Sequence, residues 1–124
     1  MYITTIKKMK NLITTILLFT VSFLQSQDKE PTFKAEGNLV KATYYFEDGS
    51  VSTQGYFLDK ALTGEWTRFD RKGNKTQIAY YDQGKKVGKW FVWGENSLKE
   101  INYSNNAVVH VNLWKHESKL TASK

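Results

Sequence analysis

Two stretches of this chain decide its fold. Residues 56–66 read Tyr-Phe-Leu-Asp-Lys-Ala-Leu-Thr-Gly-Glu-Trp, and residues 80–90 read Tyr-Tyr-Asp-Gln-Gly-Lys-Lys-Val-Gly-Lys-Trp. The second stretch repeats the first at a step of 24 residues, so that the Gly-x-Trp ending at Trp66 returns at Trp90. A fixed period of this length is typical of an array of small supersecondary units, each too small to bury its own apolar face.

The same step continues on both sides of these stretches. Tyr45 returns as Phe69 and then as Trp93, and Gly49 returns as Gly73. Because one spacing satisfies several separate correspondences, chance similarity does not explain it. Arrays of this kind usually bind or scaffold other molecules, so the repeat predicts an architecture and a class of activity without naming a partner.

The units of the array read as β-strands joined by short turns. Runs rich in Thr, Tyr, Val, Phe and Trp suit a pleated surface, and the Gly, Asn and Asp clusters between them suit tight turns. We predict strands near 40–46, 51–57, 65–69, 75–81, 89–93, 98–103 and 107–114. The expected fold is all-β, a single-layer antiparallel meander of stacked β-hairpins.

Residues two apart on a strand share a face of the sheet. The repeat therefore predicts that Ala42, Trp66 and Trp90 share one face, and that Tyr45, Phe69 and Trp93 share the other. Both faces then carry aromatic residues, so either the sheet curls to enclose each face in part, or one ladder is a contact surface. We take the second ladder as the candidate binding groove and the first as core.

Seven residues form the structural motif of the repeat: Tyr56, Gly64, Trp66, Tyr80, Gly84, Gly88 and Trp90. We expect Gly64 and Gly88 to need a positive φ or a close approach of the neighbouring hairpin. We expect the two motif tryptophans to stack on each other from one repeat to the next.

Residues 81–90 resemble the MORN repeat, whose units read roughly Tyr-x-x-Gly-Lys-x-x-Gly-x-Trp. The copy at 56–66 matches except that Lys60 stands where the family has Gly, and a third copy is degenerate, with Ser97 in place of a turn glycine and Tyr103 one residue out of step. The resemblance covers about residues 40–104 and is nearest to small bacterial MORN-variant proteins labelled as antitoxins. It implies stacked β-hairpins, with membrane-lipid association in some members and protein scaffolding in others.

The N-terminus has the layout of a secretory signal peptide over residues 1–26. Basic residues at Lys7, Lys8 and Lys10 precede an apolar run that ends at Leu24, which is shorter than the roughly 20 residues of a membrane-spanning helix. The alternative to a cleaved signal is a short N-terminal anchor helix that stays attached. The signal could also start at Met9 instead of Met1. The protein is expected to be exported, either periplasmic or secreted, and association with the cell envelope is left open.

The sequence contains no cysteine, which rules out disulfides, a thiolate metal site and a lipoprotein-type signal. The formal net charge of +6 falls to +3 on removal of residues 1–26, because 15 basic residues then remain against 12 acidic ones. This mild excess favours anionic partners only weakly, and we expect no nucleic-acid partner. We expect a disordered linker over 27–38, which holds the only proline, a repeat domain over 39–114 and a flexible tail over 115–124.

Basic residues gather near the turns and form the second set of binding candidates: Arg68, Lys85, Lys86 and Lys89. They would form a stripe for anionic lipid headgroups or an envelope glycan, because turns two apart in a hairpin stack project along one edge. The alternative is that they serve solubility and protect the sheet edges. An unidentified protein partner is the favoured hypothesis, and the oligomeric state is open.

No arrangement of residues predicts catalysis. The two histidines, His110 and His116, lie outside any metal-ligand spacing, and there is no Gly-x-Ser-x-Gly elbow or phosphate-binding loop. We therefore predict a non-enzymatic protein without cofactor or metal.

Overall fold

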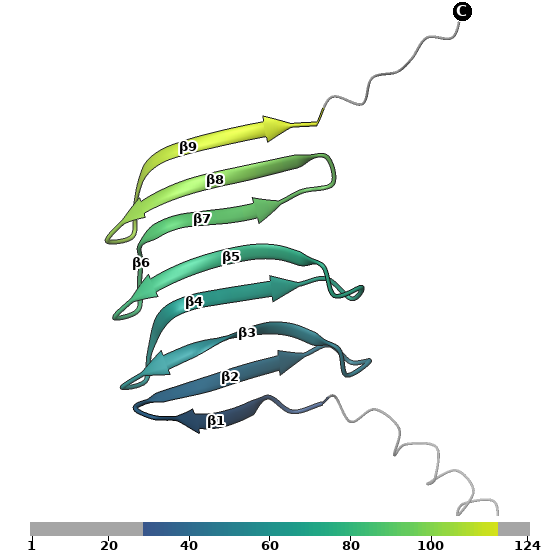
Figure 1. The fold of residues 1–124 in the computed structure, drawn as a ribbon, viewed down its shortest axis with the longest axis vertical. Coiled ribbons are helices and arrows are strands. Elements are labelled where there is room, and N and C mark those ends of the chain that lie inside the picture. Colours follow the sequence, from purple (N-terminus) through teal and green to yellow (C-terminus); the bar gives the residue numbers. More distant parts are fainter. Residues whose placement is uncertain (1–28, 117–124) are drawn as a thin grey trace, which may run out of the picture.

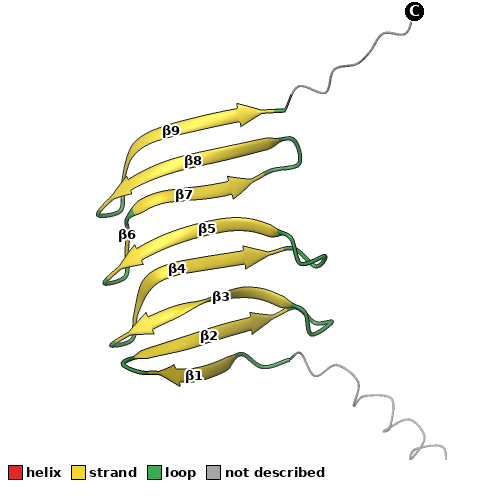
Figure 2. Ribbon diagram, in the orientation of Figure 1, coloured by secondary structure: helices red, strands yellow, loops and turns green. Residues whose placement is uncertain are grey.

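The computed structural model describes residues 29–116, which form one nine-stranded antiparallel sheet with no helix among them (Figures 1 and 2). The strands are β1 (Thr32–Glu36), β2 (Leu39–Tyr45), β3 (Val51–Leu58), β4 (Ala61–Phe69), β5 (Lys75–Asp82), β6 (Lys85–Lys86), β7 (Gly88–Trp93), β8 (Ser97–Ser104) and β9 (Ala107–Lys115). Consecutive strands are neighbours throughout, except that the short β6 pairs beside β5 just before β7. The predicted all-β meander is confirmed.

The turns alternate between the two ends of the strands, drawn left and right in Figure 1. On the left, three two-residue turns have positive φ at both positions, namely Asp59-Lys60, Gln83-Gly84 and Asn105-Asn106, whereas in the Gly37-Asn38 turn only Gly37 has it. Positive φ at both positions is the backbone of a hairpin turn that matches the right-handed twist of the strands. On the right, the turns after β2 and β4 have the same backbone hydrogen bond. The amide of Gly49 donates to the backbone carbonyl of Phe46, and the amide of Gly73 donates to the backbone carbonyl of Asp70.

The 24-residue repeat is also visible in the strands. The register shifts between Tyr44 and Tyr45 in the β2–β3 pair, and again between Arg68 and Phe69 in the β4–β5 pair. The continuous β4 corresponds to β6 and β7 together, which are separated only at Val87. The repeat thus fixes strands, bulges and turns alike.

The buried core consists of Ala42, Trp66, Ala79 and Trp90, all on one face of the sheet. The indole N–H of Trp66 donates to the carbonyl of Tyr56 at 3.0 Å, and that of Trp90 donates to Tyr80, also at 3.0 Å. The predicted grouping of these two tryptophans on one face is confirmed. Each unit satisfies its buried indole with the same backbone group, so the two units are equivalent in chemistry as well as in shape.

The motif tryptophans do not stack on each other as expected. Within the described part of the chain, Trp66 pairs with Phe57 and Tyr44, and Trp90 pairs with Tyr81 and Tyr103. Alternate strands carry the tryptophans, so strand β5 stands between Trp66 and Trp90 and supplies the intervening side chains.

Three boundaries also differ from the sequence prediction. Part of the expected linker, residues 32–36, is the edge strand β1, because it pairs with β2 from Thr32↔Thr43 to Glu36↔Leu39. Strand β4 begins at Ala61 instead of residue 65, because Gly64 adopts a φ of 62° inside the strand, beside a bulge, and does not end it. The predicted signal peptide 1–26 lies outside the described residues, as does the tail from 117 onward, whereas Lys115 ends β9.

The third unit repeats after 22 residues, which explains why it looked degenerate. The turn between β7 and β8 spans only residues 94–96. The two earlier turns on the same side in Figure 1 span residues 46–50 and 70–74. From there on the register is two residues ahead, so Tyr103 takes the place of Tyr81, and Asn105-Asn106 that of Gln83-Gly84.

Candidate functional site

The sheet has two unequal faces. We call the face that carries Trp66 and Trp90 the core face, and the face that carries Thr67 and Trp93 the outer face. In a single layer, neither face is covered by a second sheet or by a helix of the described residues. Side chains on both faces are therefore available for contact.

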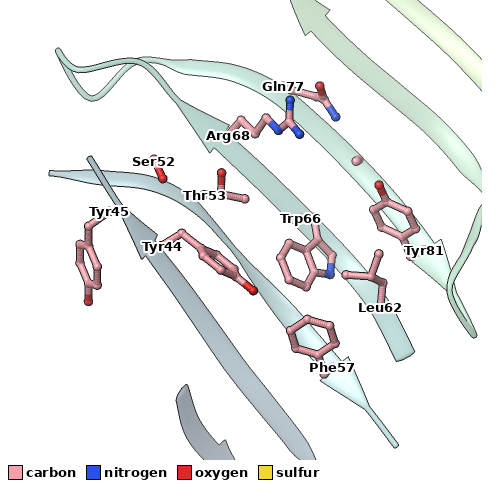
Figure 3. A pocket seen from close by; sticks show the side chains of 11 residues that line it. Tyr44, Tyr45, Ser52, Thr53, Phe57, Leu62, Trp66, Arg68, Gln77 and Tyr81 are labelled. Atoms are coloured by element: carbon pink, nitrogen blue, oxygen red, sulfur yellow. The ribbon is translucent and has the colours of Figure 1, made fainter. Parts of the chain in front are cut away.

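The core face has a hollow of about 560 Å³ over β2 to β5 (Figure 3). Its lining residues are Tyr44, Tyr45, Ser52, Thr53, Phe57, Leu62, Trp66, Arg68, Gln77, Ala79 and Tyr81. At one end of the hollow, Trp66 is surrounded by aromatic rings and Leu62. At the other end lie Arg68, Gln77 and Thr53. The hollow thus offers an apolar floor beside a polar, positively charged end.

The floor of the hollow is held by ring packing and one hydrogen bond. The ring centroid of Trp66 lies 5.1 Å from that of Phe57 in an edge-to-face arrangement, and 6.5 Å from that of Tyr44. Because the indole N–H of Trp66 is already bonded to the Tyr56 carbonyl, the ring offers apolar surface, and its donor is used within the fold. Such rings favour an apolar or aromatic group of a ligand.

The polar end is centred on Arg68, whose side chain is exposed. No carboxylate of residues 29–116 forms an ion pair with it; the two ion pairs found there join Arg71 to Asp48 and Lys89 to Glu100. Burial raises the pKa of the Tyr81 hydroxyl above its ordinary value of 10.0, and the nearby Arg68 guanidinium opposes that rise. At neutral pH the hollow therefore presents a cation and a protonated phenol.

The second unit differs from the first at two of the positions that line the hollow. Leu62 corresponds to Lys86, whose ammonium lies 5.1 Å from the Trp90 ring centroid and 5.3 Å from that of Tyr103. Arg68 corresponds to Val92, so the positive end is missing. The repeat marked both units equally, and the structure shows that Lys86 lies over the Trp90 ring where Leu62 lines the hollow beside Trp66.

The predicted basic stripe does not form. Consecutive turns lie at opposite ends of the strands. The turn at 70–74 is therefore on the right in Figure 1 and the turn at 83–84 on the left. Lys86 lies on the core face over Trp90, whereas Lys85 and Lys89 point to the outer face, where Lys89 pairs with Glu100 at 3.4 Å. Of the four basic candidates, Arg68 alone lines a hollow described here.

The aromatic candidates Tyr45, Phe69 and Trp93 end three strands that run in the same direction. Tyr45 is engaged locally, since the Lys29 ammonium lies 3.7 Å from its ring centroid and its hydroxyl is 2.9 Å from Thr32 Oγ1. Phe69 is half-buried, and Trp93 is 38% exposed and lines a shallow hollow with Leu98 and Trp114. They do not form one continuous groove: Tyr45 borders the core-face hollow instead.

Among the seven motif residues, Gly64 and Gly88 have the positive φ that was expected of them, and Gly84 has it too. Gly64, Gly84 and Gly88 have φ of 62°, 77° and 68°, so backbone conformation is the reason for glycine there. A Cβ on Gly64 would meet nothing within 4 Å, which rules out the alternative of a close approach. Sequence reasoning missed Gly55, over which Trp66 packs; its only signal was its alignment with the small Ala79.

Within residues 29–116, no group of three or more His, Asp or Glu side chains could hold a metal ion. In the same residues there is no helix long and apolar enough to cross a membrane. No protein-family model, curated protein or solved structure matches this chain. The site must therefore be interpreted from its own residues.

Proposed function

We propose that this chain is a non-catalytic, exported module of MORN-like hairpins that binds a protein partner, and that the hollow over β2 to β5 is its binding site. The observation that carries the proposal is an open aromatic floor beside an arginine without an ion-pair partner among residues 29–116. A concave, largely apolar surface with a few polar groups at one end is typical of a binding site.

The chemistry of the hollow defines the kind of partner segment. Tyr44, Phe57 and Trp66 supply surface for an aliphatic or aromatic side chain. Arg68 supplies a two-pronged donor for a carboxylate, and the Tyr81 hydroxyl supplies a further donor. The expected partner segment is therefore extended and carries an Asp or Glu close to a large apolar residue.

Peripheral binding to an anionic lipid or an envelope polymer is the second candidate. It is favoured by the mild positive charge of the chain and by the exposed Trp93 and Trp114 on the outer face. The placement of the lysines argues for the protein partner, since Lys86 and Lys89 are both engaged within the sheet and do not share a face.

Selection from a random peptide display library tests the proposal. We expect enriched peptides to share a carboxylate next to a large apolar residue, and Arg68→Glu to weaken their binding by about 10-fold or more, as expected for the loss of a charge-assisted hydrogen bond. The matched control is Trp93→Ala on the outer face, which leaves binding unchanged. Equal binding by Arg68→Glu, or loss with Trp93→Ala alone, contradicts the proposed site.

Vesicle flotation tests the second candidate. Vesicles with and without an anionic phospholipid are mixed with the wild type and with a Lys85→Glu, Lys86→Glu, Lys89→Glu triple variant. Each lysine near an anionic surface contributes about 1 kcal/mol, so lipid binding would be salt-sensitive and lost in the triple variant. We expect no flotation of either protein if the partner is a protein.

A further inference from the structure

Strand β9 exposes an unpaired edge at the C-terminal end of the sheet. It pairs with β8 on one side only, and none of the described strands lies on its other side. Its exposed large apolar residues are Val108, Val109, Val111, Leu113 and Trp114, each between 48% and 67% exposed. The backbone groups on the free side of a strand are a template for pairing with another strand.

Proteins usually protect such an edge with charges, proline or a short strand, and β9 lacks these devices. It is nine residues long, and no Asp, Glu, Lys or Arg occurs from Ala107 to Trp114. The opposite edge of the sheet is different: β1 has five residues, two of which are Lys34 and Glu36. A bulge at Val109 leaves residues 110–115 in regular register with β8.

We infer that β9 is a homodimerisation edge, at which the β9 strands of two copies pair antiparallel and join two sheets into one. A two-fold axis through Val111, Asn112 or Leu113 keeps the core faces of both copies on the same side, because residues equidistant from the axis share a face. Val111 and Leu113, opposite Ile101 and Lys99 of β8, then meet their counterparts on the core face.

The strand is self-complementary in charge as well. Lys115 is the only Lys, Arg, Asp or Glu of β9 and lies at its end, so antiparallel pairing places the two copies of Lys115 at opposite ends of the interface. On the outer face, His110, Asn112 and Trp114 meet each other without like charges. Cross-strand apolar pairs stabilise a sheet, and like charges placed directly opposite destabilise it.

A second β9 fits this edge better than β1 of another copy. Only five residues of β1 are available, so β1 would leave part of β9 unpaired. Pairing of β9 with β1 would also repeat head to tail into an open filament, whereas β9 with β9 closes on itself. The inference does not rest on the proposed function, because the hollow over β2 to β5 is separated from β9 by β7 and β8.

Cysteine cross-linking tests the dimer sharply, because the chain has no cysteine of its own. Single variants Val111→Cys, Asn112→Cys and Leu113→Cys are oxidised in solution. A residue on a two-fold axis faces its own copy, at a Cα separation that a disulfide can span. We expect one of the three to form disulfide-linked dimers faster than the other two, and Phe33→Cys on β1 to form none above background.

Sedimentation equilibrium provides the second measurement. We expect the wild type to have twice the monomer mass at high protein concentration, and the double variant Val111→Lys, Leu113→Lys to have the monomer mass. The matched control is Phe33→Lys, which adds one charge to the opposite edge and leaves the dimer intact.

A wild type that stays monomeric throughout overturns the inference, as does a dimer that survives the two lysines on β9. Dissociation by Phe33→Lys also overturns it and indicates head-to-tail pairing with β1. In each case, circular dichroism shows whether the variant is folded. Peptide binding by the hollow is measured separately, so failure of the dimer does not count against the proposed function.

Discussion

Gly55 on β3 has the least room for a side chain among the glycines of residues 29–116. A Cβ built on Gly55 would lie 2.1 Å from Cδ2 of Trp66 and 2.4 Å from Cε2 and Cγ of the same indole. The indole is also fixed by its bond to the Tyr56 carbonyl, so it cannot move aside freely. The floor of the hollow therefore depends on the absence of a side chain at one position.

Gly55→Val should lower the free energy of unfolding by about 1–3 kcal/mol, because overpacking displaces Trp66. Urea unfolding at equilibrium measures the change. Thr53→Val is the matched control, since it adds the same side chain on the same strand and face, two residues away, and should change stability less. Equal effects of the two variants would show that Trp66 does not pack on Gly55.

Lys60 occupies a backbone conformation that suits glycine. Its φ of 66° is in the left-handed region, as is the φ of 77° at Gly84, its equivalent 24 residues later. The turn at which Lys60 stands in place of the family's Gly thus keeps the geometry of the turn at Gln83-Gly84, with a non-glycine residue in the left-handed region. A non-glycine residue in this region costs roughly 1–2 kcal/mol.

Lys60→Gly should therefore raise the free energy of unfolding by about 1 kcal/mol, once the greater freedom of glycine in the unfolded chain is set against the strain. Gly84→Lys should lower stability by a similar amount and is the reciprocal test. Both are measured by the urea midpoint. A decrease with Lys60→Gly would contradict the left-handed turn.

At the scale of elements, the turns after β2 and β4 are organised by a carboxylate. Asp70 accepts hydrogen bonds from the backbone amides of Lys72 and Asn74, both at 2.9 Å. Hydrogen bonding by Asn74, through its backbone and side chain, is the main reason why the pKa of Asp70 lies below its ordinary value of 3.8. The pKa of Asp48 is lowered in the same way, chiefly by the Ser50 side chain.

A lowered folded-state pKa sets the sign of the pH dependence. The contribution of Asp70 to stability is present above pH 3.8 and is lost as the pH falls through its folded pKa. Asp70→Asn should be less stable than the wild type at pH 7, and the difference should shrink below pH 4 in urea unfolding. Glu47→Gln, in the exposed part of the other turn, is the control, and a gap that stays constant with pH would contradict this role of Asp70.

The elements were predictable where a signal was local and repeated. The turn clusters and the alternation of aromatic residues located most strands, and the 24-residue step placed Trp66 and Trp90 on one face. The edge strand β1 was missed because its five residues, Thr-Phe-Lys-Ala-Glu, have no counterpart in the repeat and follow a proline. These residues form a strand because they pair with β2, and that pairing leaves no pattern in the five residues themselves.

The candidate site was harder to predict than the fold. The assignment of residues to faces assumed that alternate residues of a strand point to opposite faces. The register shift between Tyr44 and Tyr45 breaks that alternation, and both tyrosines line the same hollow. The basic stripe does not form because only turns two apart lie on the same side of the sheet, whereas the turns at 70–74 and 83–84 are consecutive and lie on opposite sides. Arg68 was among the candidates, but its position beside Trp66 and Tyr81 required the three-dimensional pairing of β4 with β5.

At the scale of the whole molecule, the protein is a single-layer sheet with four buried apolar residues. Stability in such an array comes from contacts between neighbouring units, so each hairpin supports the next. The open faces and the free edge at β9 follow from the same architecture. Binding on the core face and pairing at the edge are the two means by which such a sheet can cover its exposed apolar surface.

The central claim is that the two units around Trp66 and Trp90 are equivalent, with each indole buried and bonded to the preceding strand. Hydrogen–deuterium exchange of the four indole N–H groups, followed by NMR, tests it most directly. Trp66 and Trp90 should exchange slowly and alike, while Trp93 and Trp114, which are 38% and 49% exposed, should exchange rapidly. Rapid exchange at either Trp66 or Trp90, or equal rates at all four, would contradict the account.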